Sequence, residues 1–271
     1  MLGIGSYAFR WAGGIGDRIP TEPITPLAIL DHAAGLGVEL VQFADNIPLH
    51  RQSPDAIDAL AQRAAALNIK IELGMTGCDP ALVETYLDLA RKLDASLLRI
   101  APSAEESAGS DKDVAALFHT ILPAARAADI VLAVENHFHL PSPRLVTIIE
   151  DVADANLGVC LDVANSIACE EWPAETIALL APYTVNLHLK DFRIALDPHG
   201  VGCAIVGVPL GQGLTDIDAV YDALTKHGRT NINTILEHWL PWQGSFAASA
   251  EQEIYWLEQS VAAARRHQNQ V

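Results

Sequence analysis

Four side chains that can bind a metal ion each lie at the end of a short apolar run. Glu135 ends "VLAVE", Asp162 ends "GVCLD", His188 lies in "VNLHLK" and Glu237 ends "TILE". If these runs are neighbouring strands, the four side chains converge, and three clustered carboxylates repel one another strongly without a cation. Each residue alone could be a helix cap or an ion-pair partner. Together they predict one divalent-metal site, and their oxygen and imidazole ligands suit Mn²⁺ or Mg²⁺, with Zn²⁺, Co²⁺ or Fe²⁺ as alternatives.

The segments that must position these residues alternate between short apolar runs and longer amphipathic stretches. The runs are rich in Ile, Val and Leu, which is typical of strands covered on both faces. Helices are expected at 53–67, 79–93, 142–155 and 215–228, and the first three begin with Ser53, Asp79 and Ser142 as N-caps, each followed by proline. Strands are expected at about 2–9, 38–44, 69–75, 96–101, 130–136, 157–163, 184–190 and 233–239.

This alternation, without a domain break over 271 residues, predicts an α/β fold: a single (β/α)8 TIM barrel spanning residues 1–271. An open doubly wound sheet is the structural alternative. Its dinucleotide-binding turn would need a glycine spacing that "GGIG" at 13–16 does not have. The stretch near 193–213 is expected to be irregular.

Further polar side chains are expected at the mouth of the barrel, because catalytic groups of this fold come from the C-terminal ends of its strands. Glu72 would be a substrate-binding carboxylate and Arg99 a clamp for a carboxylate or phosphate, unless the two form a salt bridge. Lys190 lies two residues after His188, on the same side of the strand. It could bind a substrate carboxylate or protonate an enolate, or simply pair with a neighbouring acid.

Several other residues are candidates for substrate contact. His137 is expected inward by strand parity, and Arg193 would reach substrate oxygens unless it is a solvated loop residue. Tyr7 is expected to close the pocket from the first strand, where it alternates with other aromatic residues. Trp239 could cover the apolar face of a sugar or anchor an interface. His238, by parity, is expected to point outward.

Composition excludes several classes of partner. The formal charge is −17, and no run of three or more Lys or Arg occurs, so nucleic acid is not an expected partner. The four cysteines form no C-x-x-C pair, which fits a reducing cytoplasm. The N-terminal residues lack the pattern of a signal peptide, and no apolar run is long enough to cross a membrane. A small-molecule substrate is therefore expected.

At the residues already named, the sequence resembles the xylose-isomerase-like TIM-barrel superfamily over nearly its whole length. The matching segments are "VEN" at 134–136, "LDVANS" at 161–166, "HLKD" at 188–191, "PLGQG" at 209–213 and "LEH" at 236–238. The spacing Glu135–Asp162–His188–Glu237 is similar to the Glu–Asp–His–Glu metal set of this superfamily. Its members isomerise, epimerise, dehydrate or decarboxylate sugars and sugar acids. The resemblance is specific for fold and metal, but it does not specify a substrate.

The resemblance implies that Glu135 and Glu237 are catalytic as well as metal ligands. Each would move a proton while the metal stabilises an enediolate, with no organic cofactor. The expected activity is isomerisation or epimerisation of a small sugar or sugar acid. One departure stands against an epimerase: where such enzymes usually carry histidine, this chain has Asn165, which can bind a hydroxyl but cannot shuttle protons near neutral pH.

A metal-dependent lyase is the alternative. It would decarboxylate a 3-oxo sugar acid, such as 3-oxo-isoapionate, or dehydrate a keto-polyol. Lys190, Arg99 and Asn165 favour this class, because a carboxylate substrate needs a cationic contact. Abasic-site endonucleases of the superfamily need more metal ligands and a basic surface, and a non-catalytic barrel would not need the four-ligand set. A homo-oligomer, dimer or tetramer, is also expected from the resemblance.

Overall fold

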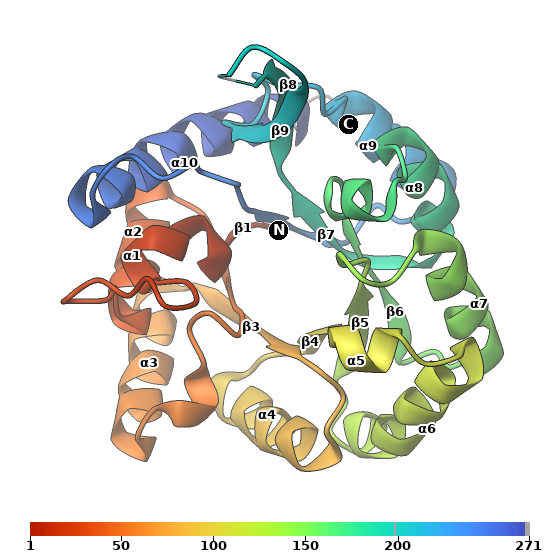
Figure 1. Cartoon of the computed structure of the whole chain (residues 1–271). Coiled ribbons are helices and arrows are strands. Elements are labelled where there is room, and N and C mark those ends of the chain that lie inside the picture. The colour runs from red at the N-terminus through yellow and green to blue at the C-terminus, as the bar shows by residue number, and fades with distance from the viewer. Residues whose placement is uncertain (198, 269–271) are drawn as a thin grey trace.

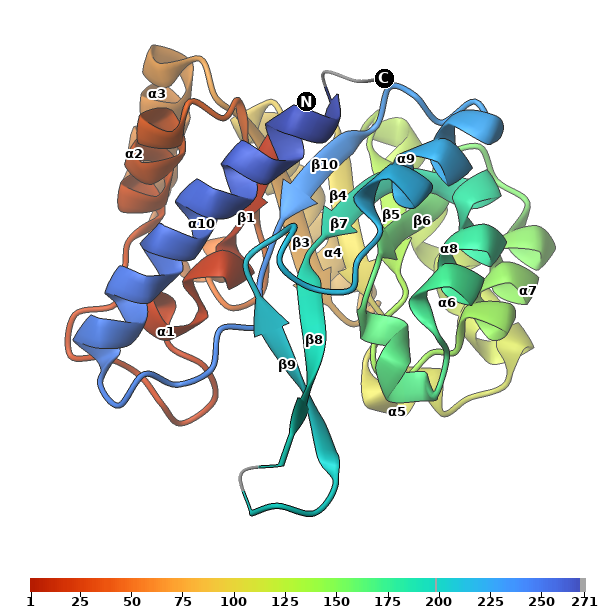
Figure 2. The same cartoon turned by 90° about the horizontal axis from the view of Figure 1, so that it is seen from above.

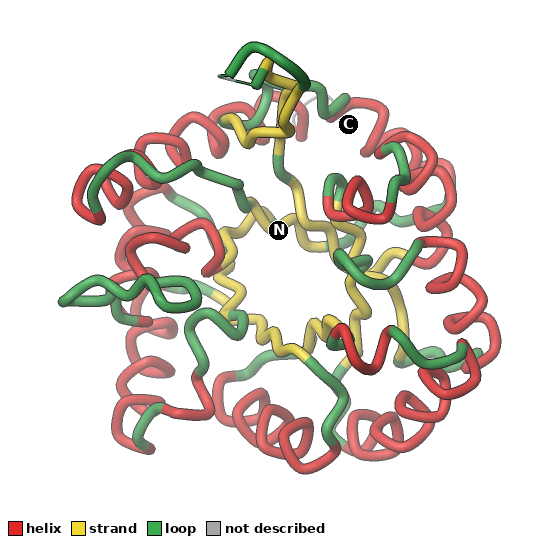
Figure 3. Tube along the Cα trace, in the orientation of Figure 1, coloured by secondary structure: helices red, strands yellow, loops and turns green. Residues whose placement is uncertain are grey.

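The computed structural model describes residues 1–197 and 199–268. In this part of the chain, eight parallel strands close into a barrel in the order β1-β10-β7-β6-β5-β4-β3-β2 (Figure 1). Figure 3 shows the ring of strands inside a ring of helices, which confirms the predicted (β/α)8 barrel. The strands are β1 (Leu2–Gly5), β2 (Leu40–Phe43), β3 (Lys70–Thr76), β4 (Leu97–Ala101), β5 (Val131–Glu135), β6 (Leu157–Asp162), β7 (Thr184–Leu189) and β10 (Asn233–Leu236).

The helices begin where the cap signals predict, with one exception. Ser53 and Asp79 accept hydrogen bonds from the third residue of their helices, as N-caps do. Ser142 is instead the first helical residue, and its N–H donates to Glu171. The helices are α1 (Arg10–Gly13), α2 (Pro26–Leu36), α3 (Pro54–Leu67), α4 (Pro80–Leu93), α5 (Ala104–Ser107), α6 (Asp111–Ala127), α7 (Ser142–Val152), α8 (Pro173–Leu180), α9 (Ile217–Lys226) and α10 (Phe246–Gln268).

The first strand is shorter than predicted. It ends at Gly5, and a 3-10 helix (Ser6–Phe9) followed by α1 replaces the expected alternation of Tyr7 with neighbouring aromatic residues. The turn is held by the Ser6 hydroxyl, which accepts a hydrogen bond from the Ala44 N–H and donates to the side chain of Asn46. These two bonds direct the chain over the barrel mouth, so Tyr7 reaches the site from a helical turn.

The segment expected to be irregular contains an antiparallel hairpin, so that expectation is wrong. Strands β8 (Asp191–Leu196) and β9 (Cys203–Val208) pair from Asp191 with Val208 to Leu196 with Cys203. Gly200 and Gly202, both with positive φ, provide the left-handed backbone in the connection. Figure 2 shows the hairpin extending beyond the barrel, on the side opposite to the chain termini.

No described helix combines the length and the apolar character that a membrane span requires. The long helix α10 instead packs against the N-terminal segment through a buried acid. Glu253, fully shielded from solvent, accepts hydrogen bonds from the backbone N–H groups of Trp11 and Ala12. Burial raises the pKa of Glu253 from its usual 4.5 to about 7, although the two amides and Arg10 oppose the shift.

This shift predicts a pH dependence of stability. Between about pH 4.5 and 7 the folded chain holds a proton on Glu253 that the unfolded chain releases, so rising pH lowers the free energy of unfolding. The slope from this group is at most about 1.4 kcal/mol per pH unit. Urea unfolding at pH 5 and pH 7.5 should show a smaller loss for Glu253→Gln than for the natural chain. The exposed Glu251→Gln is the matched control, and equal losses in all three proteins would contradict the prediction.

Candidate functional site

A ring of acidic side chains surrounds one histidine nitrogen at the mouth of the barrel. His188 Nδ1 lies 3.5 Å from Glu135 Oε1, 3.5 Å from Glu237 Oε1 and 3.9 Å from Asp162 Oδ2. All four side chains are buried, and they come from the ends of β5, β6, β7 and β10, which are neighbours in the barrel. The ligand atoms of Glu135, Asp162 and His188 all lie within 4.8 Å of one another. The sequence pattern therefore does bring these residues together.

The tautomer of His188 follows from a chain of amides beneath it. The Gln42 amide nitrogen donates to Glu72 Oε2 and Asn186 Oδ1, so Gln42 Oε1 is the atom that faces His188 Nε2, at 2.7 Å. An oxygen can only accept, so Nε2 must carry the hydrogen. Nδ1 is buried and has no hydrogen-bond partner among the described residues. Burial lowers the pKa of His188, but Cys160, Glu237 and Glu135 raise it well above the usual value, so a bound cation would take the place of the proton on Nδ1. A buried, unpartnered imidazole nitrogen among carboxylates fits a metal ligand.

Glu72 does not lie at the mouth, which corrects the expectation that it binds substrate there. Strand β3 continues to Thr76, so Glu72 lies inside the barrel, beneath the site. It accepts hydrogen bonds from the side chains of Gln42, Asn186 and Asn233. Burial raises the pKa of Glu72, and the hydrogen bonds from the three side-chain amides oppose this shift. Glu72 therefore orients Gln42 and, through it, His188.

Two buried cations balance the carboxylates. Lys190 Nζ lies 2.7 Å from Asp162 Oδ2 and 2.8 Å from Glu237 Oε2. Burial lowers the pKa of Lys190, but the charges of Asp162 and Glu237 raise it by more than burial lowers it. The net pKa therefore lies above the usual value, and the amine is a charged ammonium. Arg99 forms an ion pair with Glu135, and another of its nitrogens lies 3.5 Å from Asp45 Oδ1. Arg99 therefore does not pair with Glu72.

Glu135 is restrained on both of its oxygens. Asn165 donates to Oε1 at 2.8 Å, and the Arg99 guanidinium contacts Oε2. Burial raises the pKa of Glu135, yet Arg99 and His188 lower it more, so the net pKa lies well below the usual value. Asn165 also donates its backbone N–H to Asp162 Oδ1 and accepts a hydrogen bond from Lys190 at 3.5 Å. Asn165 thus connects three of the charged groups through its side-chain amide and its backbone N–H.

A cavity of about 230 Å³ opens above these groups and contains most of the predicted site. The predicted residues that line it are Tyr7, Arg99, Glu135, His137, Asn165, Lys190, Glu237 and Trp239. The Trp239 ring lies 5.3 Å from Lys190 Nζ. Arg193, in contrast, is exposed on β8 and is not part of the lining, because the hairpin carries it away from the mouth.

The structure also places residues here that the sequence analysis missed. His238 was expected outward, but it is buried against the cavity, and burial lowers its pKa to about 4. Arg10 lines the cavity and makes no ion pair or side-chain hydrogen bond with any described residue, although its Nε is buried. Gln42 could have been found, because a polar residue in the buried run "LVQF" needs a partner. Arg10 carries no comparable signal.

The glycine-rich segment 209–213 is tied to the site by Asp191. The two Asp191 oxygens accept hydrogen bonds from the backbone N–H groups of Phe192, Gly211, Gly213 and Thr215. The Thr215 hydroxyl donates to the Lys190 carbonyl. A Cβ at position 213 would lie 2.2 Å from the Phe192 carbonyl oxygen, so only glycine fits there. The turn therefore fixes the backbone that carries Lys190.

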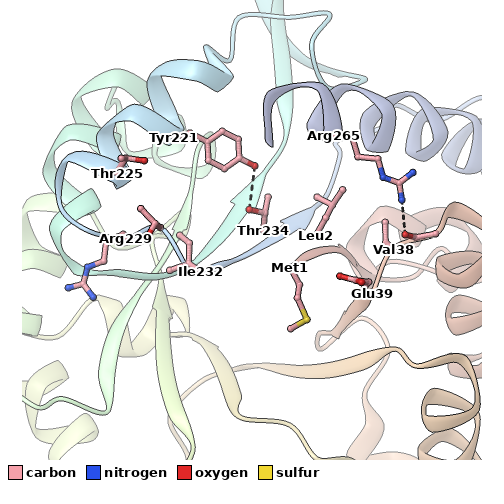
Figure 4. Close-up of a pocket in the computed structure, with 12 residues that line it drawn as sticks. Met1, Leu2, Val38, Glu39, Tyr221, Thr225, Arg229, Ile232, Thr234 and Arg265 are labelled. Atoms are coloured by element: carbon pink, nitrogen blue, oxygen red, sulfur yellow. Dashed lines mark hydrogen bonds between the residues drawn. The ribbon is translucent and has the colours of Figure 1, made fainter. Parts of the chain in front are cut away.

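A second hollow, of about 710 Å³, lies at the opposite end of the barrel (Figure 4). It is larger, but both of its arginines and its tyrosine are already engaged. Arg265 donates to the Leu36 and Gly37 carbonyls, Arg229 donates to the Pro182 carbonyl, and Tyr221 is hydrogen-bonded to Thr234. It lies at the N-terminal ends of the strands, where barrels of this type do not place catalytic groups. The smaller cavity is therefore the candidate site.

Comparisons with known proteins agree with this architecture. The chain is 34% identical over 260 residues to the 3-oxo-isoapionate decarboxylase of Pectobacterium atrosepticum, covering 96% of this chain and 93% of that protein. Among solved structures, D-psicose 3-epimerase from Clostridium cellulolyticum H10, crystallised with D-tagatose, has a TM-score of 0.72 at 17% identity and covers 99% and 98% of the two chains. A xylose isomerase-like protein from Mycobacterium smegmatis, in complex with magnesium, has a TM-score of 0.67 at 19% identity with 97% of each chain covered.

These two structures show the likeness of fold. The model of one family, described as xylose isomerase-like TIM barrel, matches residues 30–260. That match covers most of the chain, including the strands that carry the acidic ring. The chain therefore belongs to the xylose isomerase-like TIM barrel family.

Proposed function

We propose that this protein is a divalent-metal-dependent decarboxylase that acts on a small 3-oxo sugar acid. The observation that carries the proposal is the Lys190 ammonium, held 2.7 Å from Asp162 and 2.8 Å from Glu237 at the edge of the cavity. This group is a charged proton donor in contact with the site. The 34% sequence identity to a 3-oxo-isoapionate decarboxylase supports the same reaction class.

Glu135, Asp162, His188 and Glu237 would hold the metal ion, with Mg²⁺ or Mn²⁺ expected from the oxygen-rich ligand set. The unpartnered Nδ1 of His188 and the acidic ring around it fit this role. When bound, a divalent ion would stabilise negative charge that develops on a substrate oxygen. The residues beneath, Gln42 first among them, keep the imidazole in the tautomer that binds a cation.

The charge of the site favours an anionic substrate. With Asp45 beside Arg99 included, four carboxylates face two cations, Lys190 and Arg99, and a divalent ion would bring this set to neutrality. Arg10 adds a cation that is free of ion pairs among the described residues and lines the same cavity. A neutral sugar would not need this excess of positive charge, whereas a sugar acid matches it. An overall charge of −17 makes such a local reversal necessary for capture of an anion.

In the proposed reaction the bond between the carboxylate carbon and the α-carbon breaks. Its electron pair moves toward the neighbouring carbonyl to give an enolate, and the carboxylate leaves as CO₂. Lys190 then donates a proton to the α-carbon and regains one from solvent, which balances the reaction. Phe138 and Trp239 provide an apolar wall where uncharged CO₂ can form. The chain supplies binding, orientation and the acid.

The contacts of the two glutamates favour this reaction over epimerisation. An epimerase must remove a proton from carbon with a carboxylate oxygen that is free to accept it. Glu135 is held by Asn165 and Arg99, and Glu237 Oε2 is held by Lys190. Decarboxylation needs no such base. An isomerase or epimerase nevertheless remains the second candidate, because Glu135 and Glu237 both line the one cavity.

The two candidates differ in what they release. We expect the Mn²⁺-loaded protein in D₂O to release CO₂ from 3-oxo-isoapionate and related 3-oxo sugar acids, with one deuterium on the α-carbon of the product. Mass spectrometry and a coupled CO₂ assay measure both. Deuterium in recovered ketose without CO₂ release would instead establish the epimerase. No CO₂ across a broad panel of 3-oxo acids would refute the decarboxylase.

Lys190→Met should lower the rate of CO₂ release by about 10²- to 10⁴-fold, because it removes the proton donor. Metal content, measured by elemental analysis, should not fall, since Asp162 and Glu237 lose a competing cation. Lys226→Met is the matched control, because it makes the same change at an exposed lysine that lies outside the cavity lining. A Lys190→Met protein that keeps its metal and its natural rate would exclude Lys190 as the acid.

Gln42→Leu should weaken Mn²⁺ binding by about 10- to 100-fold, because the tautomer of His188 is then no longer fixed by its partner. Titration calorimetry with Mn²⁺ measures the affinity without substrate. Gln52→Leu makes the same change at an exposed position and should leave the affinity as it is. Equal affinities for the two variants would show that Gln42 does not orient the metal ligand.

A further inference from the structure

The outer edge of β8 in the β8–β9 hairpin is unpaired. Beyond Phe192, at the base of the hairpin, no described part of the chain forms backbone hydrogen bonds with this edge. The two strands form a sheet of their own, separate from the barrel. Asp197 donates its backbone N–H to Gly202 across the hairpin, whereas the Phe192 carbonyl faces away and accepts a bond from Leu214. Because backbone groups alternate along an antiparallel strand, those of Ile194 and Leu196 also face away from β9. They form an open edge that can pair with another strand.

One face of this hairpin is also apolar and exposed. Ile194 lies opposite Ile205, and Leu196 lies opposite Cys203, so all four side chains share a face. Ile194 is 50% exposed and Leu196 87% exposed. An isolated two-stranded hairpin is marginally stable in water. A long hairpin with an open edge and an apolar face is therefore typical of a contact surface.

The charges along β8 indicate which partner fits. The segment Arg193–Ile194–Ala195–Leu196–Asp197 has a cation at one end, an anion at the other and a small residue at its centre. Arg193 makes no ion pair within the described residues, and Asp197 Oδ1 accepts only the His199 N–H. If two copies pair antiparallel about Ala195, Arg193 of each copy lies opposite Asp197 of the other. The segment is complementary to itself.

We propose that β8 pairs with β8 of a second copy of this chain about a twofold axis at Ala195. The outward backbone groups of Ile194 would then bond with those of Leu196 of the second copy, and the reverse, which is the isologous pattern of a twofold dimer. Pairing centred at Ile194 would instead place Arg193 opposite Ala195 and leave both charges unmatched. The contact is locally neutral, which matters for two chains that each carry a charge of −17. This assembly is independent of the proposed reaction.

The first test is a charge exchange, read by sedimentation velocity on the full chain. The natural protein should be a dimer at micromolar concentration. Arg193→Asp and Asp197→Arg should each raise the dimer Kd by about tenfold or more, because like charges then face each other twice across the axis. The double variant Arg193→Asp/Asp197→Arg should restore the dimer, since the exchanged charges again match. A monomeric natural protein, or a double variant no better than the singles, would overturn the proposal.

Two proline variants identify the edge. Ile194→Pro removes an outward N–H from β8 and should abolish the dimer without breaking the β8–β9 ladder. Ile205→Pro is the matched control, because it removes an outward N–H from the other edge of the hairpin. A dimer that survives Ile194→Pro, or that Ile205→Pro disrupts equally, would contradict the assignment. Thermal unfolding of each variant confirms that the barrel is folded.

Cross-linking tests the axis directly and does not depend on a loss of assembly. In a Cys203→Ser background, Ala195→Cys should form a disulfide-linked dimer under mild oxidation, because facing residues of a non-hydrogen-bonded antiparallel pair are close enough for a disulfide. Ala204→Cys in the same background should not, since residue 204 lies on β9, away from the axis. Equal cross-linking at both positions, or none at 195, would refute the proposed register.

Discussion

The balance of buried charge at the barrel mouth is the constraint on which the rest of the site depends. Glu135, Asp162 and Glu237 are buried together, and their mutual repulsion would destabilise the fold if it were not compensated. Lys190 and Arg99 each pair with one or more of these acids. The compensation is incomplete, because two cations face three carboxylates, and the remaining negative charge favours a further cation.

The same balance sets the chemistry available to each group. A lysine held between two acids remains an ammonium and can act only as a donor, and a glutamate held by an arginine and an amide is a poor acceptor. Replacement of the usual histidine by Asn165 is consistent with this division, because Asn165 connects Glu135, Asp162 and Lys190 without carrying a proton. In the proposed reaction, proton donation and metal binding therefore belong to different side chains.

Much of this could be predicted from the sequence because the signals were local. Apolar runs followed by Glu135, Asp162, His188 and Glu237 give both the strands and the side of the barrel on which they end. The position of Glu72 could not be obtained in this way, because it depends on where β3 stops and on Asn233, a partner 161 residues away in sequence. Arg193 was misplaced for a related reason: the glycines at 200, 202 and 207 suit an irregular loop and obscured the strand signal of the isoleucines and valines around them. Strand parity failed for His238 since β10 ends at Leu236 and the chain then changes direction.

The short first strand ends in a glycine, Gly5, so only backbone faces the mouth of the barrel at this point. Gly5 faces Glu237 so closely that a Cβ there would lie 2.9 Å from Glu237 Oε1. A methyl group at this position would force the Glu237 side chain to shift and would alter the spacing of the ring. For directed evolution of substrate scope, codon 5 should therefore be left unvaried, while Ile15 and Phe138, which line the cavity with apolar side chains, are the better targets for a mutant library.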